Sequence, residues 1–234
     1  LVFFISFQRR FHTLVKKTKN FIETGKLGKI IFAQFDVCSY VPEWHKYENF
    51  KELYACQKNL GGGVLLTEIH ELDLCTWFFG LPDEVFCSGG NFSDIQLDVE
   101  DTAHLILGFT PTTDGHQLIG SVNLDFIRHD TTRLCTSIGE NGSLRWNGLT
   151  GDVSLYEAGA KEWRELFSYP HQPDDSYLAE WQNFIACVIE HKTPFITGED
   201  GLKVLEIIQA TRNSSATGGQ VSIIAVAQAN KDNP

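Results

Sequence analysis

Hydrophobic and polar positions follow two different patterns along this chain, and the change of pattern predicts its layout. Residues 83–168 hold short segments rich in β-branched and aromatic side chains, separated by turn residues such as Asp114-Gly115 and Asn141-Gly142, which predict strands joined by hairpins. Two of these predicted strands span residues 117–126 and 133–138. Before and after this stretch, apolar residues recur at helical spacing. The predicted helices span residues 11–23, 61–79, 175–191 and 197–210. Strands grouped between helices predict an α+β fold, with a predominantly antiparallel open sheet and helices on one face.

Three further segments complete this outline. Residues 2–7 and 29–40 are predicted strands, and residues 221–226 can add an edge strand. Residues 41–59 form a long irregular stretch that contains several aromatic side chains. Such a stretch is either functional or a packed cover. Because a sheet with apolar residues on both faces needs a second covering layer, we expect a homodimer or tetramer to form through the open face.

Composition narrows the classes of function. The formal net charge is -11 and there is no basic stripe, so we expect neither a nucleic-acid partner nor binding to a membrane. The six cysteines form no C-x-x-C pair, which disfavours a zinc site and indicates reduced, buried thiols in a cytoplasmic protein.

The length of 234 residues fits one domain over residues 1–234, and no internal repeat is present. The chain contains no methionine and begins inside an apolar run, so we expect it to be part of a longer polypeptide.

The segment 61–73 carries the strongest candidate chemistry. Gly61-Gly62-Gly63 would let a ligand or another backbone approach closely, and the helix that follows is apolar nearly all round and should be buried. Thr67 and His70 are three residues apart, as are His70 and Asp73, so each pair would share a helix face. An imidazole titrates near neutral pH and could exchange a proton with a hydroxyl group. The alternative is a core histidine that satisfies a polar contact.

Six motifs in this order resemble the C-terminal domain of the glucose–fructose oxidoreductase, inositol dehydrogenase and rhizopine catabolism (Gfo/Idh/MocA) family. The resemblance covers residues 1–216 and implies a fold like the C-terminal domains of dihydrodipicolinate reductase and glyceraldehyde-3-phosphate dehydrogenase. The motifs are Phe7-Gln8-Arg9-Arg10-Phe11-His12, Gly25-Lys26-Leu27-Gly28-Lys29-Ile30, the Gly61-Gly62-Gly63 segment with His70, Val99-Glu100-Asp101-Thr102-Ala103, Gly139-Glu140-Asn141-Gly142-Ser143-Leu144, and Gly198-Glu199-Asp200-Gly201.

The resemblance implies an oxidoreductase site with His70 as the catalytic acid or base. Thr67 takes the position of the family's Asp, and because Thr carries no charge the pKa of His70 should be tuned differently. Glu68 or Asp73 could replace that Asp, although we expect Glu68 to point to another face. Arg9 lies at a junction that borders both cofactor and substrate in the family.

The resemblance also implies NAD or NADP as cofactor, bound by an N-terminal Rossmann domain with a Glu-Lys-Pro lysine. This chain has no G-x-G-x-x-G and no Glu-Lys-Pro. We therefore expect the dinucleotide-binding domain to be missing from the chain, and the chain alone to be inactive.

Residues 41–50 resemble a subgroup linked to sugar-acid or nucleotide-sugar pathways. In that case Trp44, His45 and Tyr47 would bind the substrate, with an aromatic ring stacking on the sugar; the alternative is a packed loop. Asp125, on a predicted strand, could bind a substrate hydroxyl, or be an exposed strand residue.

Three functions follow from these observations. We favour a domain of an NAD(P)-dependent oxidoreductase acting on a sugar, sugar acid or cyclitol hydroxyl. A non-catalytic sugar-binding or dimerisation module of the same fold is the alternative. A metal-dependent hydrolase or isomerase using His45, Glu68, His70 and Asp73 is disfavoured, because these residues lack metal-ligand spacing.

Overall fold

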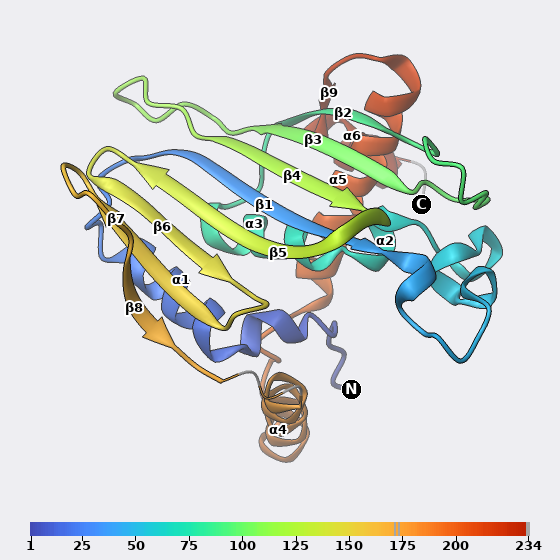
Figure 1. Ribbon diagram of the computed structural model, residues 1–234, viewed down its shortest axis with the longest axis horizontal. Helices are drawn as coiled ribbons and strands as arrows, with labels where there is room; N and C mark the ends of the chain where they lie inside the picture. Colours follow the sequence, from blue (N-terminus) through green and yellow to red (C-terminus); the bar gives the residue numbers. More distant parts are fainter. Residues whose placement is uncertain (171, 173, 233–234) are drawn as a thin grey trace.

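The computed structural model describes residues 1–170, 172 and 174–232, and a nine-stranded sheet runs through these residues (Figure 1). The strand order is β8-β7-β6-β5-β1-β4-β3-β2-β9. β1 and β4 pair in parallel, and the other neighbouring pairs are antiparallel. The strands are β1 (Ile30–Tyr40), β2 (Glu84–Gly90), β3 (Thr102–Gly108), β4 (Ile119–Asp125), β5 (Ile127–Gly139), β6 (Gly142–Asn147), β7 (Asp152–Glu157), β8 (Arg164–Ser168) and β9 (Val221–Ser222). The predicted α+β fold with a predominantly antiparallel open sheet is confirmed.

Helices cover one face of this sheet. Figure 1 shows α1, α3 and α5 behind the strands, with α4 beyond the edge of the sheet near the N-terminus. The helices are α1 (Thr13–Glu23), α2 (Val64–Thr67), α3 (His70–Phe79), α4 (Asp175–Glu190), α5 (Gly198–Thr217) and α6 (Ile223–Asp232). The 3-10 turns are η1 (Gln8–Phe11), η2 (Val41–Glu43), η3 (Phe50–Glu52), η4 (Tyr54–Cys56) and η5 (Lys58–Leu60).

The core lies between the sheet and these helices. In β1, Ala33, Phe35 and Val37 are buried toward the helices, whereas Gln34 and Asp36 lie on the opposite face. This period of two is what a sheet buried on one face requires. Burying a Phe or Leu side chain contributes about 1.5–3 kcal/mol, so the alternation fixes the register of the strands.

The opposite face of the sheet is left open and carries large apolar side chains. Phe86 pairs with Ile106 across β2 and β3, and Phe32 lies between Ile119 and Ile138 across β4, β1 and β5. Four of these residues are exposed: Phe86, Ile106, Ile119 and Ile138. We call them the open-face patch.

The strand predicted over residues 2–7 is wrong. This segment has no regular secondary structure, and no strand in the described chain pairs with it. Its side chains pack on helices instead: the ring of Phe4 stacks on Phe184 at 4.7 Å, and Ser6 Oγ donates a hydrogen bond to Glu180 Oε2 at 2.8 Å. A segment without a neighbouring strand cannot satisfy its backbone groups as a sheet strand does.

Two helical predictions also need correction. The helix predicted over residues 61–79 is broken at Glu68, whose backbone leaves the helical region (φ −98°, ψ 33°), so that α2 ends at Thr67 and α3 begins at His70. The tail predicted as an edge strand is a strand only at Val221–Ser222, before α6 begins.

The apolar stripe of α4 does not pack into the core. Four of its large side chains are about half exposed: Tyr177 49%, Leu178 57%, Trp181 55% and Ile185 51%. Helix α4 instead contacts η1, beside the N-terminal residues. We call these four residues the α4 surface.

All six cysteines are buried and free. In the part of the chain that the structure describes, no helix combines the length and the apolar character needed to cross a membrane.

Candidate functional site

A pocket of about 720 Å³ opens where η1, the end of α2, the start of β5 and α4 meet. Its lining comes from segments far apart in the sequence: Arg9, Val37, Ser39, Trp44, His45, Glu68, Thr131, Thr132, Arg133, Gly148, Leu149 and Tyr177. Three of the residues predicted for the site, Arg9, Trp44 and His45, are in this lining. We call it the Arg9 pocket.

Arg9 enters the pocket from η1 as a half-buried cation. Its Nε is buried without a hydrogen-bond partner, and no carboxylate of the described residues forms an ion pair with its guanidinium. Burial and the neighbouring charge of Arg133 lower the pKa of Arg9, because both disfavour the charged form. Glu71 and Glu68 oppose this change through space, so Arg9 remains charged at neutral pH and the pocket holds a positive charge that has no ion pair among the described residues.

Arg133, from β5, shares the pocket wall with Glu68. Arg133 Nη2 donates a hydrogen bond to Glu68 Oε2 at 2.5 Å. Arg133 Nε also lies 3.0 Å from Glu71 Oε1, although the geometry is not that of a hydrogen bond and both Glu71 oxygens remain without a partner. Burial raises the pKa of Glu71 to about 7, with Arg133 opposing the rise and Glu68 adding to it. Glu68 thus faces the pocket, contrary to the prediction that it points elsewhere.

His70 lies beside the pocket and is not one of its lining residues. His70 is half-buried, and its ring meets the ring of Phe7 edge-on at a centroid distance of 6.2 Å. Burial, Arg9 and Arg133 together lower the pKa of His70 to about 3, so the imidazole is neutral at physiological pH. Its Nδ1 is buried without a partner, as is Thr67 Oγ1. Thr67 and His70 therefore make no hydrogen bond to each other. The break at Glu68 places their side chains differently from those of residues three apart in a continuous helix.

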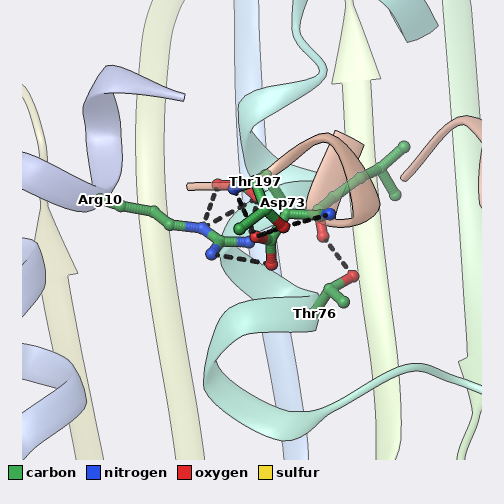
Figure 2. A network of polar contacts seen from close by, with 6 residues as sticks. Arg10, Asp73, Thr76 and Thr197 are labelled. Atoms are coloured by element: carbon green, nitrogen blue, oxygen red, sulfur yellow. Dashed lines mark hydrogen bonds and ion pairs between the residues drawn. The ribbon is translucent and has the colours of Figure 1, made fainter. Parts of the chain in front are cut away.

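Asp73, the other candidate partner for His70, is held by Arg10 (Figure 2). Arg10 Nη2 donates to Asp73 Oδ1 at 2.6 Å, and its Nε contacts both carboxylate oxygens at 3.0 Å. Arg10 Nη1 also donates to Asp200 Oδ1 at 3.2 Å, at the start of α5, where Thr197 and Asp200 form a capping box. This network joins η1, α3 and α5. It leaves Asp73 committed to a structural role.

The aromatic residues predicted to bind substrate separate into two groups. Trp44 is half-buried in the pocket wall, where its Nε1 donates to Ser39 Oγ at 2.9 Å and its ring meets Phe126 edge-on. His45 lines the pocket, and its Nδ1 lies 2.5 Å from Glu48 Oε1. Tyr47 is 84% exposed and stacks on His45 outside the lining. Trp44 and His45 can thus present ring faces to a ligand in the pocket.

Asp125 lies at the end of β4, outside the pocket lining. Its Oδ1 accepts hydrogen bonds from the backbone N–H groups of Ile127 and Arg128, at 3.1 and 2.9 Å. These bonds hold the turn into β5, so the carboxylate is already engaged in forming local structure.

Two of the three glycines in the 61–63 segment are needed for close packing. A Cβ on Gly62 would come within 2.4 Å of the Tyr54 carbonyl oxygen, and one on Gly63 (φ +106°) within 2.5 Å of Glu100 Oε1. The close approach predicted for a ligand is therefore made at these two positions by the protein itself. A second pocket of about 680 Å³ adjoins this turn, with Glu100 and Arg212 in its lining, but none of the predicted catalytic or substrate-binding residues lies there.

The metal hypothesis gains no support from the geometry. Within the described ranges, no three His, Cys, Asp or Glu side chains are grouped so that they could hold a metal ion. Arg133 and Tyr177 also line the pocket, and neither was predicted from the sequence as a site residue. The sequence does contain an indication for Arg133. It alternates with Cys135 and Ser137 in β5, which are buried, so it lies on the same face of the strand, and a charge on that face requires a partner.

The structure is an α+β domain with a nine-stranded sheet among the described residues and a pocket that contains Arg9, and comparison with known proteins identifies its family. The model of the Gfo/Idh/MocA oxidoreductase family, C-terminal alpha/beta domain, matches residues 19–223, so the chain belongs to this family.

Characterised relatives are sugar and polyol dehydrogenases. The chain is 27% identical over 222 residues to myo-inositol 2-dehydrogenase of Thermotoga maritima, covering 92% of this chain but 62% of that protein. Levoglucosan dehydrogenase in complex with NADH superposes with a TM-score of 0.79 at 19% identity, over 95% of this chain and 66% of that one. The WlbA dehydrogenase from Bordetella pertussis, in complex with NADH and UDP-GlcNAcA, has a TM-score of 0.68 at 23% identity, over 91% of this chain and 61% of that one. The chain thus spans less than two thirds of these relatives, and the structural likenesses establish the fold alone.

Proposed function

We propose that this chain is the substrate-binding and catalytic domain of an NAD(P)-dependent dehydrogenase that oxidises a hydroxyl group of a sugar, sugar acid or cyclitol. The observation that carries the proposal is the Arg9 pocket. It combines ring faces, hydroxyl groups and charged side chains, as polyol recognition requires, and it adjoins a neutral imidazole. Membership of a dehydrogenase family supports the same function.

In this proposal His70 exchanges the proton of the reacting hydroxyl. A neutral imidazole has a free lone pair, so His70 can accept that proton when a substrate lies against the pocket wall. A base whose pKa is near 3 is weak at neutral pH, and a rise in that pKa would strengthen it. Negative charge brought close to Arg9 and Arg133 would produce such a rise, because both cations lower the pKa of His70.

The described residues do not form a dinucleotide cradle. The sequence has no G-x-G-x-x-G, and the described residues provide no strand–turn–helix of that kind. The cofactor would be held by a separate dinucleotide-binding domain, and when bound it would accept the hydride. The α4 surface and the exposed side chains of Leu1 and Phe3 offer an apolar face against which that domain would pack.

The test is an oxidation assay on the polypeptide that carries this domain together with its dinucleotide-binding domain. NAD(P)H formation is measured with cyclitols, aldoses and sugar acids, for the wild type and for His70→Gln. We expect the substitution to lower kcat/KM by about 10²–10⁴-fold and to remove one limb of its pH profile. His191→Asn is the matched control, because His191 is exposed at the end of α4 and Asn tolerates its positive φ of 54°. Unchanged kcat/KM and an unchanged pH profile in His70→Gln would exclude the proposed role of His70.

We also propose that two copies associate through the open-face patch. Exposed apolar residues that are neighbours across strands form a surface that a second copy would cover. Ile106→Asp should shift the molecular mass measured by light scattering to that of a monomer, whereas an unchanged mass would place any interface elsewhere.

A further inference from the structure

Arg9 is a half-buried charge without an ion pair among the described residues, and Glu71 and Glu68 offset it only through space. Its Nε lies out of contact with solvent and without a hydrogen-bond partner, and the described residues provide no ion pair for its guanidinium. Leaving a buried charge unpaired is costly, and proteins normally avoid it. A group that compensates Arg9 is therefore expected to come from outside the described chain.

The charges around Arg9 define what kind of group this is. Arg133 is the other cation of the pocket, and it is already paired with Glu68 at 2.5 Å and close to Glu71. Glu68 balances Arg133 in the lining. Glu71 lies outside the lining and burial raises its pKa to about 7, so at neutral pH it offsets the single positive charge of Arg9 only in part. A monoanion would balance it, whereas a phosphate dianion would meet the repulsion of Glu68.

We propose that Arg9 binds the carboxylate of a sugar-acid substrate, while Trp44 and His45 contact the sugar ring. This inference rests on the proposed function and narrows its substrate class. The planar guanidinium matches a carboxylate in size and geometry. The hydroxyl groups of Thr131 and Thr132, which also line the pocket, can bond the ring hydroxyls of the same ligand.

Binding to the 234-residue chain, measured by calorimetry with D-glucuronate and with D-glucose, tests this inference without the cofactor. We expect wild type to prefer D-glucuronate. Arg9→Gln should weaken D-glucuronate binding by about 10- to 100-fold, because a hydrogen bond between charged groups is worth that factor, and should weaken D-glucose binding much less. The matched control is Arg164→Gln, which removes the same charge from an exposed position on β8.

A second variant keeps the test valid if Arg9→Gln does not fold. Glu68→Gln removes the negative charge of the pocket and frees Arg133, so it should strengthen D-glucuronate binding by several-fold relative to D-glucose binding. Weaker D-glucuronate binding in this variant would contradict the charge arrangement that we infer.

Three results would overturn the inference, and they are distinguishable. Equal affinity for the acid and the sugar, with no effect of Arg9→Gln, would reject the carboxylate site and leave the proposed dehydrogenase function standing. Absence of binding by both compounds would reject the sugar pocket itself. Binding of inorganic pyrophosphate that depends on Arg9 and excludes D-glucuronate would assign Arg9 to the phosphates of a cofactor.

Discussion

Arg9 and Arg10 are neighbours in the sequence and carry the same charge, yet the fold gives them opposite surroundings. Arg10 is buried and contacts both oxygens of Asp73, with Asp200 as a further partner (Figure 2). Arg9 points into a pocket of about 720 Å³, where its Nε has no partner. The single 3-10 turn η1 thus directs Arg9 into the pocket and Arg10 into the protein interior.

The difference separates a structural charge from a functional candidate. A buried guanidinium that is paired with carboxylates holds together the elements that it joins. Its removal leaves those buried carboxylates without a positive partner. A guanidinium without partners adds no such link, and groups of this kind concentrate where ligands bind. The same residue type in the same motif therefore leads to two different expectations when it is substituted.

The largest expected effect is the loss of stability in Arg10→Met. The substitution leaves the fully buried Asp73 carboxylate without its partner and should lower the free energy of unfolding by about 3–5 kcal/mol. Urea denaturation followed by circular dichroism measures this change. The double variant Arg10→Met with Asp73→Leu removes both charges and should recover much of the loss. If the double variant were as unstable as the single one, the network would not act through its charges.

The strands could be predicted because one face of the sheet is buried and the other is not. β4 was predicted over residues 117–126 and is observed over Ile119–Asp125, since Val122 and Leu124 alternate with polar residues. β5 extends six residues before the predicted start at residue 133. Its first part, with Arg128, His129 and Asp130, is exposed and has no alternation to detect.

The candidate site could be predicted only in part, because its contacts join distant segments. Arg9, Trp44 and His45 lie in recognisable motifs, and all three line the pocket. The pair of Glu68 and Arg133 is separated by 65 residues, and no local pattern reveals it. The assumption of a continuous helix over residues 61–79 misled the prediction for Glu68, because the backbone break turns this side chain toward Arg133.

The next effect in size concerns the protonation of His70. Arg9→Gln removes one of the two cations that lower the pKa of His70, so this pKa should rise from about 3 by roughly one pH unit. Nuclear magnetic resonance of the imidazole Cε1 proton, titrated against pH, measures the change, and Arg164→Gln serves as the control. A lower or unchanged pKa would show that Arg9 does not act on His70.

The same shift changes how stability depends on pH. Because the folded-state pKa of His70 lies below the value of 6.5 for a free imidazole, the unfolded chain binds a proton that the folded chain does not. His70 therefore contributes stability above pH 6.5, and this contribution is lost as the pH falls from 6.5 toward 3. Raising the pKa in Arg9→Gln shortens this interval, so the variant should lose less stability than wild type on acidification.

The smallest expected effect is that of Arg9→Gln on stability at neutral pH. Arg9 has no ion pair in the described chain, so the substitution breaks none. It also removes a guanidinium whose burial has a free-energy cost. The free energy of unfolding should stay within about 1 kcal/mol of wild type, or increase. Urea denaturation of Arg9→Gln beside Arg10→Gln measures the contrast between the two neighbours directly. A loss in Arg9→Gln as large as that in Arg10→Gln would mean that Arg9 supports the fold, and its assignment to a ligand would lose its physical basis.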